Sequence, residues 1–311
     1  MRSAESADAA CRVGPGIVAR GPVNSAGRTP RLRTGRERGR AAGGGAVSPG
    51  DMVVVALAGV AAGGINAVVG SGTLVTFPAL LAAGLPPVTA TITNSLGLVP
   101  GNLTGAVGYR RELRGLGPLV VRLLPASVLG ALSGAFLLLH LPAEAFHAVV
   151  PVLVALAVVL VATQPLISSR LARRQGVVDD ERADDPLVQA LTPRRLVGLL
   201  AGAYATGTYG GYFAASQGVL QVGVFGLLVR LPLQRLNAVK NVLVLAVNSV
   251  AAAAYVIVAP GRIDWTAAAL VAGGSVVGAW FGSSVGRRLP SVALRAGIVA
   301  LGLVSLVVLL R

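Results

Sequence analysis

The chain has 311 residues and a formal net charge of +15, yet 54% of its residues are hydrophobic and only 13% are charged. With a mean hydropathy of +0.75, this composition excludes an ordinary soluble domain. The charge does not indicate nucleic-acid binding, because nine arginines lie in residues 1–50 and most others lie at the ends of apolar segments, where they act as membrane topology signals.

Residues 1–50 form a basic tail, rich in glycine, arginine, alanine and serine, that is expected to be disordered. It has no apolar region next to a small-residue cleavage site, so it does not read as a secretory signal. Three interpretations stay open: a disordered cytoplasmic arm, a segment that contacts anionic lipid, or translated upstream sequence with the true start near Met52. The single cysteine, Cys11, lies here, so the sequence offers no disulfide framework and no thiol-rich metal site.

After the tail, the chain consists of apolar segments near the roughly 20 residues that span the hydrocarbon core of a bilayer. Long alternating strands are absent, so a barrel is not expected. We predict an all-α fold, a polytopic transmembrane helical bundle with two short, glycine-broken helices near the midplane. The predicted segments are 52–69, 73–84, 88–109, 117–139, 145–167, 195–212, 214–229, 236–258, 265–285 and 292–310.

The two halves of the sequence also resemble each other, because a shift of 146 positions aligns residues 64–109 with 210–255 without a gap, and a shift of 148 aligns the glycines further on. The matched pairs include Gly64 and Gly210, Gly72 and Gly218, Asn102 and Asn248, and Tyr109 and Tyr255. Such repeats with interrupted helices are typical of secondary transporters that bind their substrate between the halves. The predicted domains are a first transmembrane repeat (51–169), a cytoplasmic linker (170–193) and a second transmembrane repeat (194–311).

Arginines predict which connections face the cytoplasm. They place the linker and the connection after segment 88–109 inside. Placing Arg230, Arg235, Arg287 and Arg288 inside as well inverts the second half relative to the first. That favoured arrangement counts five crossings per half and an outer N-terminus. In the alternative, each glycine-broken pair is one re-entrant unit, which gives eight segments and a cytoplasmic N-terminus.

Two glycine-rich stretches, 63–73 and 209–219, carry the first candidate site residues. In a bilayer, clustered glycine and polar residues indicate a helix break, whose freed amides must find partners in protein, ligand or trapped water. A short helix that starts at Thr73 would present free N–H groups and a positive dipole end to an anion. The alternative is close helix packing through small residues, which explains Asn66, Ser71 and Gln217 poorly.

A polar patch follows each break, and Lys240 is the only lysine of the chain. Asn237, Lys240 and Asn241 are spaced to share one helical face, and Lys240 aligns with Asn94 of the first half. A charge within an apolar segment normally faces a cavity and marks a functional path. The alternative is that Lys240 lies near the membrane surface and extends its ammonium into the headgroups.

These stretches resemble the sulfite exporter TauE/SafE family of bacterial membrane permeases over residues 52–311. The resemblance is carried by Thr93–Gly101, Gly108–Leu113, Tyr209–Phe213 and Asn237–Asn241. It implies a permease for sulfite, sulfonates or related small anions in the cytoplasmic membrane. The chain departs from the family at Ser71, Ser216 and Gln217, where glycines are frequent, which puts close backbone approach to the ligand in doubt.

The resulting hypothesis is a transporter of a small anion, bound between the repeats at the two helix ends, with Lys240 as counter-charge. Loss of the lysine proton when the site empties would couple transport to the proton gradient, although another coupling ion is also open. The residues predicted to bind the substrate are Asn66, Ser71, Gly72, Thr73, Asn94, Ser95, Tyr212, Ser216, Gln217, Gly218, Asn237, Lys240 and Asn241.

No cofactor, metal site, catalytic residue or nucleic-acid partner is predicted. An enzyme is not expected, because the apolar segments contain no pair of acids and no nucleophile with its base. An anion channel and a non-transporting membrane assembly subunit are the alternatives that remain. The oligomeric state is left open.

Overall fold

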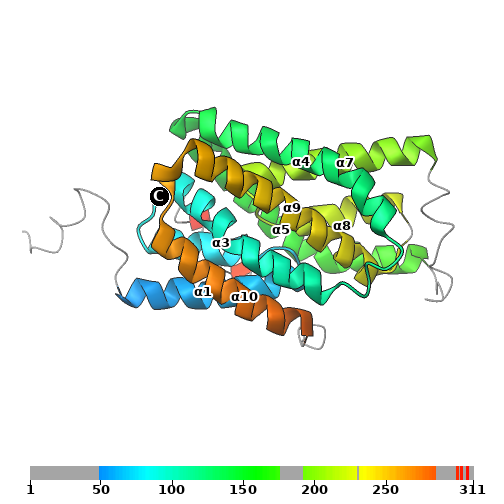
Figure 1. Cartoon of the computed structure of the whole chain (residues 1–311), viewed down its shortest axis with the longest axis horizontal. Coiled ribbons are helices and arrows are strands. Elements are labelled where there is room, and N and C mark those ends of the chain that lie inside the picture. Colours follow the sequence, from blue (N-terminus) through cyan, green and yellow to red (C-terminus); the bar gives the residue numbers. More distant parts are fainter. Residues whose placement is uncertain are drawn as a thin grey trace, which may run out of the picture. The chain divides into compact units, whose positions relative to one another are not determined.

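The computed structural model describes residues 49–175, 192–229 and 231–284, and the positions 299, 300, 302, 303, 306 and 307. The predicted tail up to residue 48, the middle of the linker (176–191), Arg230, Arg287, Arg288 and most of segment 292–310 lie outside the described residues. Within the described ranges the chain is helical, with short connections (Figure 1).

The helices agree closely with the predicted segments. Their bounds are α1 (Pro49–Val68), α2 (Thr73–Ala82), α3 (Pro87–Gly108), α4 (Gly117–His140), α5 (Ala143–Gln175), α7 (Pro193–Tyr212), α8 (Gln217–Leu228), α9 (Leu233–Val258), a short 3₁₀ turn (Pro260–Arg262) and α10 (Trp265–Ser284). Among them, α1, α4, α5, α9 and α10 are long and apolar enough to cross a membrane. The predicted all-α transmembrane bundle is confirmed.

The largest difference in bounds is at α5, which continues to Gln175, beyond the predicted end at residue 167 and into the predicted linker. The start of α8 also differs, because this helix begins at Gln217 rather than at residue 214. Ala214 and Ser216 have φ angles of +62° and +60°. This left-handed conformation interrupts a right-handed helix and is unusual for residues other than glycine. The short helix therefore starts only after Ser216.

Two close helix pairs form the sides of the bundle: α1 packs against α10, and α4 packs against α7 (Figure 1). Glycines make both contacts possible. A Cβ atom at Gly278 would overlap the main-chain carbonyl of Val60, and one at Gly134 would overlap that of Thr208. Small residues at such spacing let helix backbones approach closely in membranes. The close contacts of both helix pairs therefore depend on these glycines.

We expect Gly278→Ala to destabilise the protein by about 1–3 kcal/mol, because the added methyl group overpacks the α1–α10 contact. Gly273→Ala is the matched control on the same helix, since a Cβ there meets nothing within 4 Å. The control should gain up to about 1 kcal/mol from the better helix propensity of alanine. Melting temperatures in detergent measure both. Equal values for the two variants would contradict the described contact.

Helices α3 and α9 pack against each other and run in opposite directions. Arg235, in the first turn of α9, donates from Nη2 to the carbonyl oxygen of Arg114 after the end of α3, at 2.6 Å. At the other end, the amide of Asp264, after α9, donates to Oγ1 of Thr93 near the start of α3, at 3.1 Å. Each contact joins the end of one helix to the beginning of the other.

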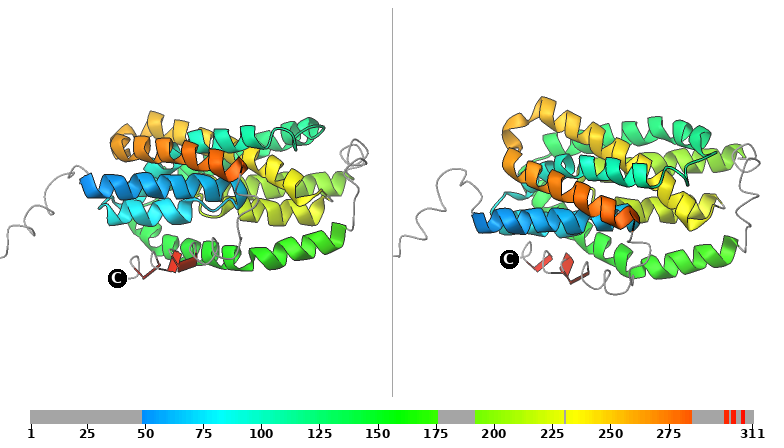
Figure 2. Two further views of the ribbon diagram at one scale, coloured as in Figure 1. Left: turned by 90° about the horizontal axis from the view of Figure 1, so that it is seen from below. Right: turned by 60° about the horizontal axis from the view of Figure 1, so that its bottom comes forward.

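The short helices make hairpins that enter the bundle from opposite ends. Figure 2 shows α1 and α2 side by side at one end, and α7 and α8 at the other. α2 leads into α3 and α8 leads into α9, so the opposite directions of α3 and α9 also reverse the hairpins. By the positive-inside rule, the end that carries Arg114, Arg194 and Arg235 is predicted to be cytoplasmic, and α1 starts at the opposite end.

This topology has features of both arrangements predicted from the sequence, the inverted halves and the paired broken helices. Each broken pair forms a hairpin, as in the re-entrant alternative, and the two hairpins nevertheless enter the bundle from opposite ends. If the arginine-rich end is cytoplasmic, as the positive-inside rule predicts, α1 starts on the outer side. That the halves are homologous repeats stays a prediction from the aligned sequences.

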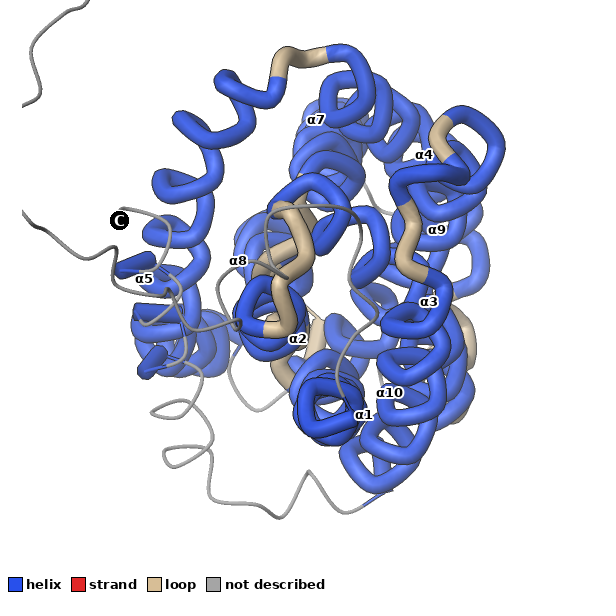
Figure 3. Tube along the Cα trace, turned by 90° about the vertical axis from the view of Figure 1, so that its left-hand side faces the viewer, coloured by secondary structure: helices blue, strands red, loops and turns tan. Residues whose placement is uncertain are grey.

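Seen end-on, α2 and α8 lie in the middle, between α5 on one side and α3 and α9 on the other (Figure 3). The apolar core around them includes Phe77 of α2 and Phe213 at the end of α7, whose rings meet edge to face at 5.1 Å. This arrangement buries the polar residues at the start of both short helices.

Candidate functional site

The tips of the two hairpins meet inside the bundle. The amide of Gly218, at the start of α8, donates to the carbonyl oxygen of Gly70, just before α2, at 3.2 Å. A Cβ atom at Gly70 would lie only 2.6 Å from the Cα of Gly218. Gly70 also has a φ of +85°, which glycine adopts without strain. The two breaks, 148 residues apart in sequence, therefore form one continuous polar region.

Asparagines brace the first break. Oδ1 of Asn66 accepts a hydrogen bond from the amide of Gly72 at 3.4 Å, and its Nδ2 donates to Oδ1 of Asn102. Asn94, on α3, donates from Nδ2 to Oγ1 of Thr73 at 3.2 Å and accepts one from Oγ1 of Thr76. Of the predicted site residues, Asn66, Gly72, Thr73 and Asn94 are therefore brought together.

Lys240 crosses the junction of the tips. Its Cδ lies beside Gly218, where a Cβ would come within 2.8 Å of it. Its Nζ donates to the carbonyl oxygens of Asn66 and Ala67 at 3.1 and 3.5 Å, and Asn241 donates from Nδ2 to Ala67 at 3.3 Å. The side chain is fully buried, so extension of its ammonium to the membrane surface is wrong.

The ammonium of Lys240 thus lies at the C-terminal end of α1. The last carbonyls of a helix have no intrahelical partner and carry partial negative charge, so a cation there is favourable. This placement gives Lys240 a structural function that its sequence neighbours do not indicate. An ammonium has three donors, and the two described carbonyls leave one of them for another acceptor.

In the second break, two predicted side chains turn away from Lys240. Ser216 donates from Oγ to the carbonyl oxygen of Ala157 in α5 at 3.3 Å. The ring of Tyr212 packs against Phe146 of α5, with centroids 5.8 Å apart. Two other tyrosines brace the loop through their hydroxyl groups: Tyr209 donates to Ala215 O and Tyr255 donates to Gly211 O.

The main-chain amides at the start of α8 already donate hydrogen bonds within the protein. They are therefore not available to an anion, contrary to the prediction for this helix end. The amides of Val219 and Leu220 donate to the carbonyl oxygen of Ser216, and that of Gly218 donates to Gly70. The ligand groups available at this helix end are therefore side chains. Ser95 and Asn237 are also buried, on α3 and α9.

Buried polar atoms without a partner in the described part of the chain cluster on the breaks. They include Oγ of Ser71 and both amide atoms of Gln217 and Gln221, whereas Nδ2 of Asn102, Oγ of Ser127 and Oδ1 of Asn248 are unpaired elsewhere on α3, α4 and α9. Gly210 accommodates the Gln217 amide, because a Cβ there would lie 2.6 Å from its Nε2. Buried polar groups almost always find partners, so unpaired ones need an explanation such as a ligand or ordered water.

Gln221 is a further candidate site residue that was not predicted from the sequence. It is fully buried and lies one helical turn after Gln217, on the same face of α8. The available signal was a second glutamine at i+4 in an otherwise apolar short helix. Among the described residues, no group of three or more His, Cys, Asp or Glu side chains is arranged to hold a metal ion.

The family model of the sulfite exporter TauE/SafE family matches residues 55–309 of the chain. The chain belongs to this family. It is therefore a member of a family of membrane transporters and a multi-pass membrane protein. The usual location of bacterial TauE/SafE proteins is the cytoplasmic membrane.

Two curated relatives are described as probable membrane transporter proteins. ORF9 of Sinorhizobium sp is 31% identical over 169 residues, which cover 54% of this chain and 60% of the relative. YfcA of Escherichia coli strain K12 is 27% identical over 244 residues, which cover 78% of this chain and 82% of the relative. No solved structure matches the chain.

Proposed function

We propose that this chain transports a small anion, such as sulfite or a sulfonate, which binds where the two hairpin tips meet. The observation that carries the proposal is the buried junction of Gly70 and Gly218, surrounded by polar side chains with unpaired atoms. Substrate sites at the meeting point of broken helices are a recurring design of secondary transporters.

The side chains at this junction supply the positive charge and the hydrogen-bond donors that an oxyanion requires. Lys240 supplies a positive charge with one donor remaining, and the amide groups of Gln217 and Gln221 supply two donors each. The amide oxygens accept from a hydroxyl group, as a protonated oxyanion would offer. The site is neutral apart from Lys240, so an anion compensates the buried charge. Release of the lysine proton from the empty site would link transport to the proton gradient.

The proposal is tested by reconstituting the purified protein into liposomes and measuring efflux of sulfite, methanesulfonate and chloride. We expect sulfite or the sulfonate to leave faster than from protein-free liposomes, and chloride to leave no faster. Absence of accelerated sulfite and sulfonate efflux would contradict the proposal. Unitary current steps in a planar bilayer would favour an anion channel instead.

Gln221→Leu separates binding from stability in the same assay. We expect transport to fall about tenfold, because a substrate hydrogen bond is lost, while the melting temperature stays equal or rises, since an unpaired buried amide is removed. Gln234→Leu is the matched control, since Gln234 is exposed at the start of α9. Unchanged transport by Gln221→Leu would place the substrate elsewhere.

A further inference from the structure

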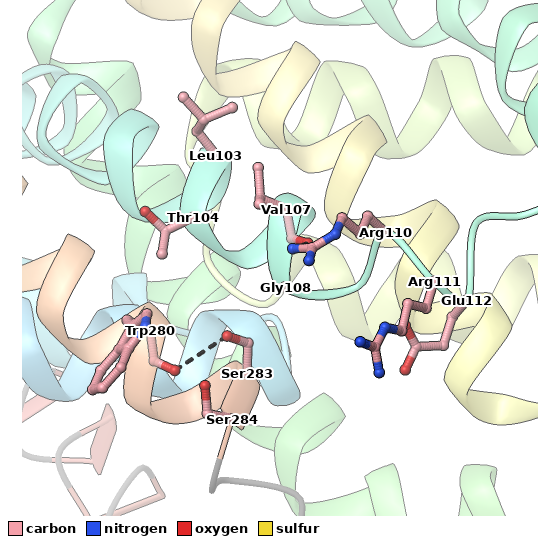
Figure 4. A pocket seen from close by; sticks show the side chains of 10 residues that line it. All are labelled: Leu103, Thr104, Val107, Gly108, Arg110, Arg111, Glu112, Trp280, Ser283 and Ser284. Atoms are coloured by element: carbon pink, nitrogen blue, oxygen red, sulfur yellow. Dashed lines mark hydrogen bonds between the residues drawn. The ribbon is translucent and has the colours of Figure 1, made fainter.

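A second site is suggested by a cavity of about 630 Å³ between the ends of α3 and α10 (Figure 4). It is remote in sequence from both helix breaks. Its polar lining includes Thr104, Arg110, Arg111, Glu112, Ser283 and Ser284. Figure 4 shows the two guanidinium groups on one side and Trp280, Ser283 and Ser284 on the other.

The cavity lies next to a close contact between the ends of the two helices. Gly108 lies so close to Ser283 that a Cβ at this position would overlap the serine side chain. α3 ends at Gly108, and the chain then turns away toward α4, whereas α10 continues to Ser284. The cavity therefore lies beside a tight helix contact, and the two arginines, which follow the end of α3, line one side of it.

The charge of the cavity suits a phosphate group. Arg110 donates from Nη1 to the carbonyl oxygen of Val107 at 3.5 Å, which leaves most of its five donors available. Arg110 and Arg111 are exposed, and they outnumber the one carboxylate, Glu112, in the lining. Guanidinium groups bind phosphate through paired hydrogen bonds.

The apolar lining is continuous with the charged part and points to a lipid. Leu103, Val107 and Trp280 are 53%, 50% and 58% exposed, respectively. Leu103 and Val107 lie on the same face of α3, about 10 Å and 5 Å along the helix before Arg110. A ligand that fills this surface has an apolar chain along the helix and an anionic group at its end. A free inorganic anion would use only the charged part.

We propose that this cavity binds an anionic phospholipid, with its phosphate at Arg110 and Arg111 and its acyl chain along Leu103, Val107 and Trp280. The site lies at the end of the bundle predicted to be cytoplasmic, where basic pockets between transmembrane helices recognise anionic headgroups. It is independent of the substrate site and of the proposed transport function.

The other half of the bundle provides an internal comparison. A cavity of about 670 Å³ lies along α4, α7 and α9, and its lining includes Phe136, His140, Tyr204 and Val258. Its described lining contains neither arginine nor lysine. Of the two cavities, only the one at α3 and α10 combines apolar walls with guanidinium groups, so selectivity for anionic lipid is expected there.

The experiment is native mass spectrometry of delipidated protein titrated with phosphatidylglycerol or phosphatidylcholine of the same acyl chains. We expect the first bound phosphatidylglycerol to be preferred about tenfold or more. Arg110→Gln/Arg111→Gln should abolish this preference, and Arg110→Lys/Arg111→Lys should retain most of it. Trp280→Ala should weaken both lipids.

Arg194→Gln/Arg195→Gln is the matched control, because it removes two exposed charges at the same end of the bundle without touching the cavity. This control should keep the preference. An equal loss in both double variants would show diffuse charge attraction and overturn the proposal. Displacement of the lipid by equimolar glycerol 3-phosphate would show a site for soluble anions and also overturn it. Melting temperatures in phosphatidylcholine micelles verify that each variant is folded.

Discussion

Lys240→Gln is expected to lower anion affinity and transport by about tenfold to a hundredfold. The substitution removes the single charge of the proposed site, and a hydrogen bond to a charged group contributes about 1.5–3 kcal/mol. The glutamine amide still carries donors for the carbonyl oxygens of Asn66 and Ala67, which Lys240 binds in the native protein. The end of α1 therefore stays satisfied while the charge is lost.

Lys240→Met provides the comparison, because it removes both the charge and the donors. If the lysine acts as counter-charge, both variants lose transport of sulfite in liposomes. If it only completes the end of α1, the glutamine variant transports like the native protein and the methionine variant alone is impaired. Thermal shift with small oxyanions gives a second measurement, since only a binding-competent protein is stabilised by its ligand.

Gly70→Ala is expected to destabilise the protein by about 2–5 kcal/mol and to abolish transport. The alanine would need a left-handed conformation, which costs roughly 1–2 kcal/mol. Its Cβ would also lie 2.6 Å from the Cα of Gly218, and such overpacking costs about 1–3 kcal/mol. The tips of the hairpins would be forced apart.

Gly84→Ala separates these two contributions. Gly84 has a φ of +91°, and a Cβ there meets nothing within 4 Å. Its substitution should therefore show only the conformational contribution of about 1–2 kcal/mol and leave transport nearly unchanged. Melting temperatures in detergent and sulfite efflux measure both variants. Equal losses of stability would contradict a close contact between the tips.

Helix positions were predictable because apolar runs and their boundary residues are local signals. The predicted segment 88–109 differs from α3 by one residue at each end, since Pro87 favours a helix start and the apolar run ends before the arginines. The start of α8 was less predictable. Ala214 and Ser216 adopt left-handed conformations that their residue types disfavour, so only tertiary packing selects them.

The residue types of the candidate site were predictable from the sequence, but the contacts between these residues were not. Glycine, asparagine and lysine in apolar segments indicated the breaks, and the structure brings most of them together. The contact of Lys240 with the end of α1 joins residues 174 positions apart, which no local pattern reveals. The direction of the hairpins was also inaccessible, because charge counting alone allowed either inverted halves or re-entrant pairs.

In the proposed transport cycle, the direct hydrogen bond between Gly218 and Gly70 limits how the substrate site can open to each side of the membrane in turn. If one tip withdrew alone, this hydrogen bond would break and the two hairpins would separate, which would open the proposed site to both sides of the membrane at once. A leak-free cycle therefore requires the two tips to move as one plug against α3 and α9. Cross-linking the tips to each other would then preserve turnover, whereas tying either tip to α3 or α9 would stop it.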